Sequence, residues 1–352
     1  MNKYEDRLSV LIPTYNRKSE LARVIEGLSK QTNKEFEVVI SDNASNYDVN
    51  ALLDTVDEEL KNRIHIYVRP FNIGGSVNIL ECSSLCETKW AWLLSDDDIV
   101  KENAVEIIYT WIDKFPSCGC FNFSLCNMDE FKTSDYIAME SIDDFLNIYR
   151  GRPYCHGDLI FMSNKVYNME AISDYMIYAF KYANSGLFRT ILYAKILEKN
   201  IPFICVNNKV VEYDSESPRA WDVTGIMLAS TMLEDVPYDI SEKKRRQLVK
   251  IQAFNIETIY ELFFICRGKD KGNNRYFFDK MYNGLYKYIL TFGSRLHMRI
   301  IASTTKFDIG FYAWRTMFKL RFKLRDKAVE YAKNSKYKET IKRLVVKFNK
   351  YG

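Results

Sequence analysis

The stretch WAWLLSDDDIV, residues 90–100, places three consecutive carboxylates directly after a short apolar run. Such a run, followed at once by polar residues, is typical of a buried strand that ends in a loop. Ionising three neighbouring carboxylates is unfavourable unless a cation compensates them. Because no cluster of His or Cys accompanies them, we predict that they hold Mg²⁺ or Mn²⁺ against a phosphorylated substrate. The alternative is a polar turn whose last Asp caps the helix predicted over residues 101–112, but capping explains one Asp and not three.

Three further apolar runs precede this one, at residues 8–12, 36–41 and 64–68. The segments Lys18–Gln31, Val49–Leu60 and Gly75–Cys86 lie between the runs and are each long enough for several helical turns. A regular succession of strand and helix predicts right-handed crossovers and a parallel sheet. Ligands bind such sheets beyond the carboxyl ends of the strands, where the strand order reverses.

A polar loop follows each of the four predicted strands: PTYNR, SDNAS, RPFNIGGS and SDDD. We therefore expect the four loops to meet at one edge of the sheet. Asp42 is placed to accept hydrogen bonds from a base or a ribose, although an Asx-turn explains it equally well. The paired glycines of the third loop allow backbone N–H groups to approach an anion, while Asn72 or Asn78 could simply brace that loop.

The rest of the chain changes character twice. Strands are predicted within residues 118–126, 158–162, 202–206 and 209–213, with helices at Ile142–Tyr149 and Ser185–Lys199. After residue 216 the pattern is mostly helical. We predict a first domain over residues 1–215, in two parts at about 1–115 and 116–215, followed by a helical basic region over 216–352.

Charge is divided unevenly along the chain. Residues 241–352 contain 27 Lys and Arg against 9 Asp and Glu, whereas the preceding residues contain 23 against 37. Aromatic residues recur at helical spacing among these bases, at Phe311, Trp314, Phe318 and Phe322. This pattern indicates helices that lie on an anionic membrane surface, or apolar stripes that pack on the protein's own core. The stretch FKLRFKLR also fits a strand, and no recognised motif supports binding to nucleic acid.

No segment has the features of a secretory signal or of a membrane-spanning helix. The eight cysteines show neither paired CxxC spacing nor the density of a small secreted scaffold, so we expect reduced thiols in a cytoplasmic protein.

The motifs LSVLIPTYNR, FEVVISDNAS, NIGGSVN and WLLSDDD, in this order, resemble the inverting family 2 glycosyltransferases. The resemblance covers about the first 115 residues closely and residues 116–215 loosely. It implies that residues 1–215 are a catalytic domain, with a nucleotide-sugar half at about 1–115 and an acceptor half at about 116–215. It implies the GT-A fold, a Rossmann-like mixed α/β sheet flanked by helices, and a divalent metal ion at Asp98 and Asp96. The residues expected to bind the nucleotide-sugar are Pro13, Thr14, Tyr15, Arg17, Asp42, Asn43, Arg69, Asn72, Gly74, Asn78, Asp96 and Asp97.

Two positions depart from the family pattern. The first position of the acidic motif is Ser95, and Val77 stands where many members have an arginine before the Asn of the third loop, so Arg69 could replace that contact. An inverting transfer also needs a carboxylate that deprotonates the acceptor hydroxyl. The Glu-Asp pair that usually supplies it is not recognisable, so we predict Asp158 first and Asp174 second as the base, with a loop or capping Asp as the alternative.

The sequence thus predicts an inverting, metal-dependent transfer of sugar from a nucleotide-sugar, with a UDP-sugar favoured, to a glycan or polyprenyl-linked acceptor. By the resemblance, the protein extends a bacterial surface polysaccharide such as O-antigen or capsule, at the inner face of the plasma membrane. The alternatives are a nucleotidyltransferase that makes an NDP-sugar and a non-catalytic glycan- or membrane-binding module with the same fold.

Overall fold

The computed structural model describes residues 5–150, 152, 155–212 and 235–252, together with isolated helical positions between 296 and 320. The chain divides into two compact units, Met1–Gln252 and Ala253–Gly352. The predicted boundary near residue 215 stays a prediction. The aromatic stripes predicted for the tail lie largely outside the described residues.

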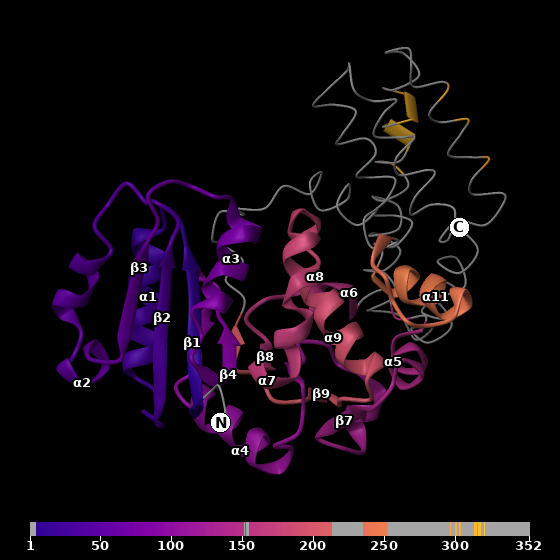
Figure 1. The fold of residues 1–352 in the computed structure, drawn as a ribbon, viewed down its shortest axis with the longest axis horizontal. Coiled ribbons are helices and arrows are strands. Elements are labelled where there is room, and N and C mark those ends of the chain that lie inside the picture. Colours follow the sequence, from indigo (N-terminus) through magenta and orange to yellow (C-terminus); the bar gives the residue numbers. More distant parts are fainter. Residues whose placement is uncertain are drawn as a thin grey trace. The chain divides into compact units, whose positions relative to one another are not determined.

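The first unit is built on an eight-stranded sheet with the order β3-β2-β1-β4-β8-β6-β9-β7 (Figure 1). Its strands are β1 (Glu5–Thr14), β2 (Phe36–Asp42), β3 (Ile64–Val68), β4 (Thr88–Leu93), β6 (Cys120–Phe123), β7 (Tyr136–Met139), β8 (Lys165–Asn168) and β9 (Phe203–Val206). The mixed α/β sheet flanked by helices confirms the predicted fold class.

The four strands predicted in the first half are confirmed, and they are parallel. β1 pairs with β2 on one side and with β4 on the other, and β2 pairs with β3. The chain therefore moves outward from β1 to β3 and then returns to the other side of β1. This places the reversal of strand order between β1 and β4, where such sheets bind their ligands.

Helices connect these strands largely as the sequence predicts. Helix α1 (Lys18–Ser29) buries the apolar side chains that recur along its sequence at the helical period, Leu21, Val24, Ile25 and Leu28. Helix α3 (Gly75–Ser84) and helix α4 (Ala104–Lys114) follow β3 and β4. The helix predicted over Val49–Leu60 is instead the 3₁₀ helix η1 (Asn50–Thr55) followed by α2 (Glu58–Lys61). The Asp57 side chain accepts the N–H of Leu60 and so starts a new helix there.

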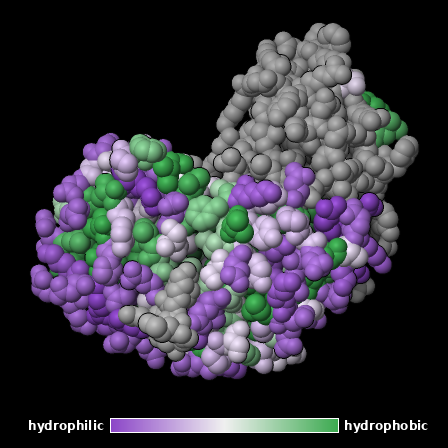
Figure 2. All heavy atoms as spheres, viewed as in Figure 1, coloured by the Kyte–Doolittle hydropathy of each residue, from purple (hydrophilic) through white to green (hydrophobic). Residues whose placement is uncertain are grey.

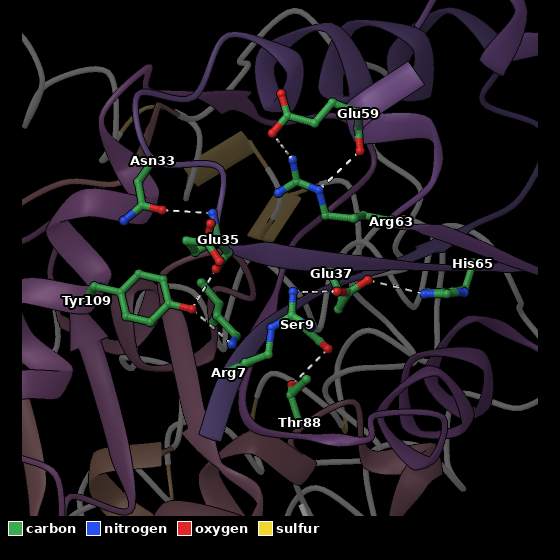
Figure 3. Close-up of polar contacts among 11 residues, drawn as sticks. Arg7, Ser9, Asn33, Glu35, Glu37, Glu59, Arg63, His65, Thr88 and Tyr109 are labelled. Atoms are coloured by element: carbon green, nitrogen blue, oxygen red, sulfur yellow. Dashed lines mark hydrogen bonds and ion pairs between the residues drawn. The ribbon is translucent and has the colours of Figure 1, made fainter. Parts of the chain in front are cut away.

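Polar contacts hold the amino-terminal half of the strands in register (Figure 3). Glu37 of β2 lies between Arg7 of β1, at 2.7 Å, and His65 of β3, at 3.3 Å. The Tyr109 hydroxyl of α4 donates to the carbonyl of Glu35 at 2.6 Å and accepts the N–H of Leu8 at 3.2 Å. These contacts fasten α4 to the sheet far from the ends of the strands that carry the polar loops.

The second half adds two short strands that the sequence analysis missed, β7 and β8. β8 is antiparallel to both β4 and β6, which joins the two halves into one sheet. Four residues are too few to show a period, which explains why both strands were missed. The strand predicted over residues 158–162 is wrong: residues His156–Ile160 form helix α6. The remaining helical segments are η2 (Asp129–Lys132), α5 (Ile142–Tyr149), α7 (Met169–Ile172), η4 (Ser173–Tyr175), α8 (Met176–Lys181), η5 (Ala183–Ser185) and α9 (Phe188–Glu198).

A separate two-stranded sheet follows the acidic triplet. β5 (Ile99–Val100) pairs antiparallel with β10 (Val211–Glu212), so Glu212 lies opposite Ile99. Helix α11 (Glu242–Gln252) belongs to the same unit, and Lys244 contacts Asp143 of α5 at 2.7 Å.

The seven cysteines within the described residues are free thiols. No helix that the structure describes is long and apolar enough to cross a bilayer. Figure 2 shows apolar residues among hydrophilic ones on the face that it presents. Val68 and Phe71, at the end of β3 and in the loop after it, are among the most exposed large apolar residues.

Candidate active site

The site begins where β1 and β4 separate. The last paired residues of these strands are Leu11 and Leu93, and the N–H of Leu94 still donates to the carbonyl of Leu11. Pro13 follows two residues later and has no N–H to donate to a neighbouring strand. It remains paired in register with Ser41 of β2. The proline therefore lies where the sheet opens on the β4 side, at the reversal of strand order.

The loops after β1 and β2 are hydrogen-bonded to each other. The N–H of Asn16 donates to the Ser45 hydroxyl at 2.8 Å, and the Asn16 side chain accepts the N–H of Asn46 at 2.8 Å. Asn16 has φ 55° and Ala44 has φ 64°, a left-handed conformation that is uncommon for residues with a side chain. Such strain tends to persist where the surrounding contacts enforce it, as they do here.

The loop after β3 is held in the same way. The Asn43 side chain donates to the Asn72 side chain at 2.8 Å and accepts the N–H of Ile73 at 2.9 Å. The N–H of Arg69 donates to the carbonyl of Asp42. Three of the four predicted loops thus form one connected rim.

Asp42 and Asn78 both act in the bracing role that the sequence left open as an alternative. The buried carboxylate of Asp42 accepts the N–H of Ser45, three residues on, at 3.1 Å and so braces its own loop, although an Asx-turn would bond the residue two positions on. Asn78, also buried, is hydrogen-bonded to the hydroxyl of Ser41 at 2.8 Å and to its carbonyl at 2.9 Å. Asn78 therefore fastens the start of α3 to the end of β2.

Gly74 and Arg69 are the members of the third loop that a ligand could approach, although the N–H of Gly74 already donates to the Asn72 side chain at 2.8 Å. Gly74 has φ 87°, and a Cβ built there meets nothing within 4 Å, so the backbone is accessible to a ligand. Arg69 contacts Glu81 at 3.4 Å, while its Nε is buried without a hydrogen-bond partner among the described residues. Tyr15, in the loop after β1, is exposed.

Within the acidic triplet, Asp97 is held by arginines. Its carboxylate contacts the Arg17 guanidinium at 2.9 Å and accepts the Ser95 hydroxyl at 2.6 Å. Its carbonyl accepts a hydrogen bond from Arg23 at 2.8 Å. Arg17, predicted to bind the nucleotide, therefore also ties the loop after β1 to the loop after β4.

Asp96 is 8% exposed, and burial raises the pKa of its carboxyl to about 6. The neighbouring Asp97 carboxylate adds to this rise, whereas the Thr14 hydroxyl and the Arg17 charge oppose it. The hydroxyl oxygens of Thr14 and Tyr47 are buried here without a hydrogen-bond partner of normal geometry among the described residues. A buried carboxylate beside unpartnered polar atoms is typical of a site built for a ligand.

Asp98 is 3% exposed and accepts a hydrogen bond from the hydroxyl of Ser163, a residue of the second half. The described residues contain no group of three His, Cys, Asp or Glu placed to hold a metal ion. An ion at Asp96 and Asp98 therefore needs oxygen ligands from a bound molecule as well. Mg²⁺ and Mn²⁺ bind in this way, with few carboxylates, water and substrate phosphate, so the residues fit such an ion.

Asp158, the first predicted base, is 4% exposed in the first turn of α6. One carboxylate oxygen accepts the N–H of Leu125 at 2.7 Å and the Asn164 amide at 3.0 Å. The other accepts from Asn122 at 2.8 Å and Ser124 at 3.0 Å. Four donors around a buried carboxylate favour an anchoring role, and the assignment as base stays a prediction.

Asp174, the second predicted base, is exposed on η4. β8 runs antiparallel to β4, so its last residue, Asn168, lies opposite Trp90 near the start of β4. The short helix α7 and then η4 follow from that edge of the sheet, away from the acidic triplet. The structure thus brings together the predicted nucleotide and metal residues but does not place Asp174 with them.

Three residues at or beside the site were missed by the sequence analysis: Tyr47, Ser163 and Lys165. Tyr47 belongs to the loop after β2, and its place close behind Asp42 could have drawn attention to it. Ser163 and Lys165 come close to the end of β4 only because β8 pairs with β4, and no local feature of the sequence indicates this. Burial lowers the pKa of the Lys165 ammonium to about 8, against the opposing effect of the Asp158 charge.

The replacement Asp96→Asn should stabilise the protein when no metal is present. Because its folded-state pKa of about 6 lies above the ordinary value of 3.8, Asp96 costs stability as pH rises from about 4 to 6. The full cost at pH 7 is on the order of 3 kcal/mol, and the neutral amide avoids it. We expect Asp96→Asn to raise the free energy of unfolding by about 1–3 kcal/mol at pH 7 in EDTA, and by little at pH 4. Urea unfolding across this pH range checks it, and a pH-independent difference would contradict it.

The replacement Asp158→Asn separates the two roles of that residue. If Asp158 is an anchor, the replacement places an amide donor in front of the Asn122 and Ser124 donors and removes the negative charge that offsets the buried Lys165 ammonium. We then expect the free energy of unfolding to fall by about 3–5 kcal/mol. The control Asp174→Asn, on an exposed side chain, should change it by less than about 0.5 kcal/mol. An Asp158→Asn protein of undiminished stability that binds a donor without turnover would restore Asp158 as the base.

Comparison with known proteins agrees with this geometry. Residues 9–174 match the family model described as glycosyl transferase family 2. The abequosyltransferase RfbV of Salmonella typhimurium is 30% identical over 108 residues, which cover 30% of this chain and 32% of that protein. The glycosyltransferase GlyG of Streptococcus pneumoniae serotype 4 is 27% identical over 108 residues, 30% of this chain and 35% of that protein. The matches thus span about a third of the length of these relatives.

Among solved structures, S. aureus TarS 1-349 in complex with UDP-GlcNAc superimposes with a TM-score of 0.57 at 15% identity, covering 81% of this chain and 82% of that one. The complex of the same protein with UDP gives a TM-score of 0.57 at 14% identity, with coverage of 88% and 91%. At these identities the likeness concerns the fold, which is that of the GT-A transferases. The segment 9–174, which holds the four loops and the acidic triplet, thus carries a glycosyl transferase family 2 domain.

Proposed function

We propose that this protein is a divalent-metal-dependent glycosyltransferase that moves a sugar, with inversion, from a nucleotide-sugar to a hydroxyl of a glycan or lipid-linked acceptor. The observation that carries the proposal is the pair of buried carboxylates, Asp96 and Asp98, in a loop that contacts the three other loops directly or through their shared hydrogen bonds. Ionising a buried carboxylate is costly, and a cationic ligand offsets that cost. The family of the domain makes a nucleotide-sugar with its ion the natural occupant.

In this proposal the loops divide the donor between them. Asp42 and Asn43 face the base and ribose, while Thr14, Tyr15 and Arg17 line the nucleotide from the β1 side. Arg69 offers a cation to the diphosphate, and Gly74, which has no side chain, leaves space for the diphosphate to approach the loop. Asp96 and Asp98 hold Mg²⁺ or Mn²⁺, which when bound supplies positive charge to offset the charge developing on the departing nucleoside diphosphate.

The donor class is proposed as a UDP-sugar. TarS, which shares the fold, is described with UDP-GlcNAc and with UDP. The acceptor is proposed as a growing surface glycan on a lipid carrier, in keeping with RfbV, which is described as an abequosyltransferase. Such an acceptor would place the enzyme in the cytoplasm, at the inner face of the membrane.

Asp98→Ala should abolish metal-dependent nucleotide binding while the protein stays folded, because one of its two buried anionic ligands is gone. The measurement is a thermal-shift screen of UDP-, GDP-, CDP- and dTDP-sugars, each with Mn²⁺, Mg²⁺ or EDTA. A ligand at a hundredfold excess over its Kd stabilises the folded state by about 2.7 kcal/mol. We expect one nucleotide class to shift the wild-type protein only with metal, and no shift for Asp98→Ala.

Asp113→Ala is the matched control, since Asp113 is exposed on α4 and the replacement changes the net charge equally. It should behave as the wild type. Undiminished metal-dependent binding by Asp98→Ala refutes the metal assignment. No shift of the wild-type protein by any of the four donor classes counts against the transferase proposal as a whole.

We further propose that the basic carboxyl-terminal region binds an anionic membrane surface, which would bring the site to a lipid-linked acceptor. The support is the excess of 27 Lys and Arg over 9 Asp and Glu in residues 241–352. Each base near an anionic bilayer contributes about 1 kcal/mol to binding. No part of the proposal involves nucleic acid.

Reversing two charges of the tail, Lys342→Glu with Arg343→Glu, should therefore weaken binding to phosphatidylglycerol vesicles by at least about 2 kcal/mol, or roughly 30-fold, at low salt. Vesicle sedimentation of the full chain measures this. The control, Lys30→Glu with Lys132→Glu, makes the same change on exposed residues of the first unit. Equal binding by the tail variant, the control and the wild type removes the membrane proposal.

A further inference from the structure

The segment between α6 and β8, residues 161–164, lies beside the acidic triplet because β8 is the neighbour of β4 in the sheet. Its central residue, Ser163, is fully buried, and its hydroxyl donates to the Asp98 carboxylate. The same hydroxyl oxygen accepts the N–H of Ser95 at 2.9 Å. The carbonyl of Ser163 accepts the indole N–H of Trp92 at 2.7 Å. One residue of the second half thus contacts β4, the start of the acidic loop and a proposed metal ligand.

This arrangement fixes the direction in which the hydroxyl donates. A serine hydroxyl has one proton to donate and accepts through its lone pairs. Since the N–H of Ser95 already donates to the oxygen, the proton of Ser163 is left to point at the Asp98 carboxylate. The contact therefore sets the orientation of that carboxylate even before a ligand arrives.

The position of Ser163 is itself fixed by its neighbours. The Asn164 amide donates to Asp158 at 3.0 Å and accepts the Lys165 ammonium at 2.7 Å. Lys165 also donates to the carbonyl of Asp158 at 2.8 Å and to Asn122 at 2.6 Å. Asp158, Asn164 and Lys165 are all buried, so these contacts form a rigid polar network beneath the segment.

We propose that Ser163 is a positioning residue for Asp98, and that the network of Asp158, Asn164 and Lys165 serves to hold Ser163 in place. Outer partners of this kind orient metal ligands, and losing one typically costs 10- to 100-fold in metal affinity. The inference rests on the proposed function, because it concerns the ion that Asp98 is proposed to bind. The proposal also explains why this buried polar network is present, which the transfer reaction by itself does not.

Ser163→Ala tests the proposal through Mn²⁺ affinity, without any need for turnover. The measurement is titration of the full chain with Mn²⁺, followed by the electron paramagnetic resonance signal of the free ion. UDP or GDP is present, whichever stabilises the wild-type protein in the thermal-shift screen. We expect the apparent Kd for Mn²⁺ to rise about 10- to 100-fold.

Ser124→Ala is the matched control. Ser124 is also buried and donates its hydroxyl to Asp158 at the other end of the network, and within the described residues its side chain makes no hydrogen bond to the acidic loop. It should lower thermal stability about as much as Ser163→Ala while changing the Mn²⁺ affinity less than threefold. A purely structural role of Ser163 predicts equal effects of the two variants on both measurements.

Ser163→Cys provides a second variant of nearly the same size, should the alanine protein not fold. A thiol is a weak donor, so the Mn²⁺ affinity should still fall by about tenfold. Wild-type affinity in the folded Ser163→Ala or Ser163→Cys protein overturns the positioning role while leaving the proposed function intact. Absence of Mn²⁺-dependent nucleotide binding in the wild-type protein overturns the proposed function, and this inference with it.

Discussion

The separation of β1 from β4 is the constraint on which the rest of the site depends. If β1 and β4 were hydrogen-bonded along their whole length, the loops that follow them would begin side by side, with no space for a ligand between them. Pro13 cannot donate to such a ladder, and the pairing with β4 ends at Leu11. Because the strand order reverses at the same place, the gap opens where four loops converge.

The electrostatics of the site follow from that geometry. The three carboxylates lie in the loop directly after β4, and each has different surroundings. Asp97 is neutralised by Arg17, Asp96 is destabilised by burial, and Asp98 is oriented by Ser163. Asp97 thus makes a structural contact, whereas Asp96 and Asp98 are the proposed metal ligands. The buried carboxylate of Asp96 lowers the stability of the folded protein, and a bound cation would offset this cost. Such a loss of stability is common at functional sites.

Much of the first half could be predicted from sequence because its signals are local. The apolar runs at 36–41 and 64–68 have a polar loop directly behind them, and α1 repeats its apolar residues at the helical period. Helix α5 was predicted with its observed bounds, since Ser141 caps it and Phe145, Leu146 and Tyr149 mark its buried face. These features need only a few neighbouring residues to be recognised.

What could not be predicted depends on contacts between distant residues. The four-residue strand β8 is recognisable only from its pairing with β4 and β6. The apolar letters of residues 159–162 fit either a strand or a helix, and the helix forms because Asp158 is fixed by donors from residues 122–125. Ser163 meets Asp98 across 65 positions of sequence. A single chain read on its own contains no sign of such a partnership.

The shared use of Ser163 has a consequence for how such chains can diversify. A family that evolves new acceptors by exchanging the second half of the domain would, at this junction, also exchange the hydroxyl beneath Asp98 and the carbonyl that holds the Trp92 indole. A recombinant joined near residue 115 would keep the four loops of the first half but would lose Ser163, which is proposed to orient Asp98. The residues from the first strand through at least β8 therefore have to be exchanged together, so the two halves are not interchangeable modules.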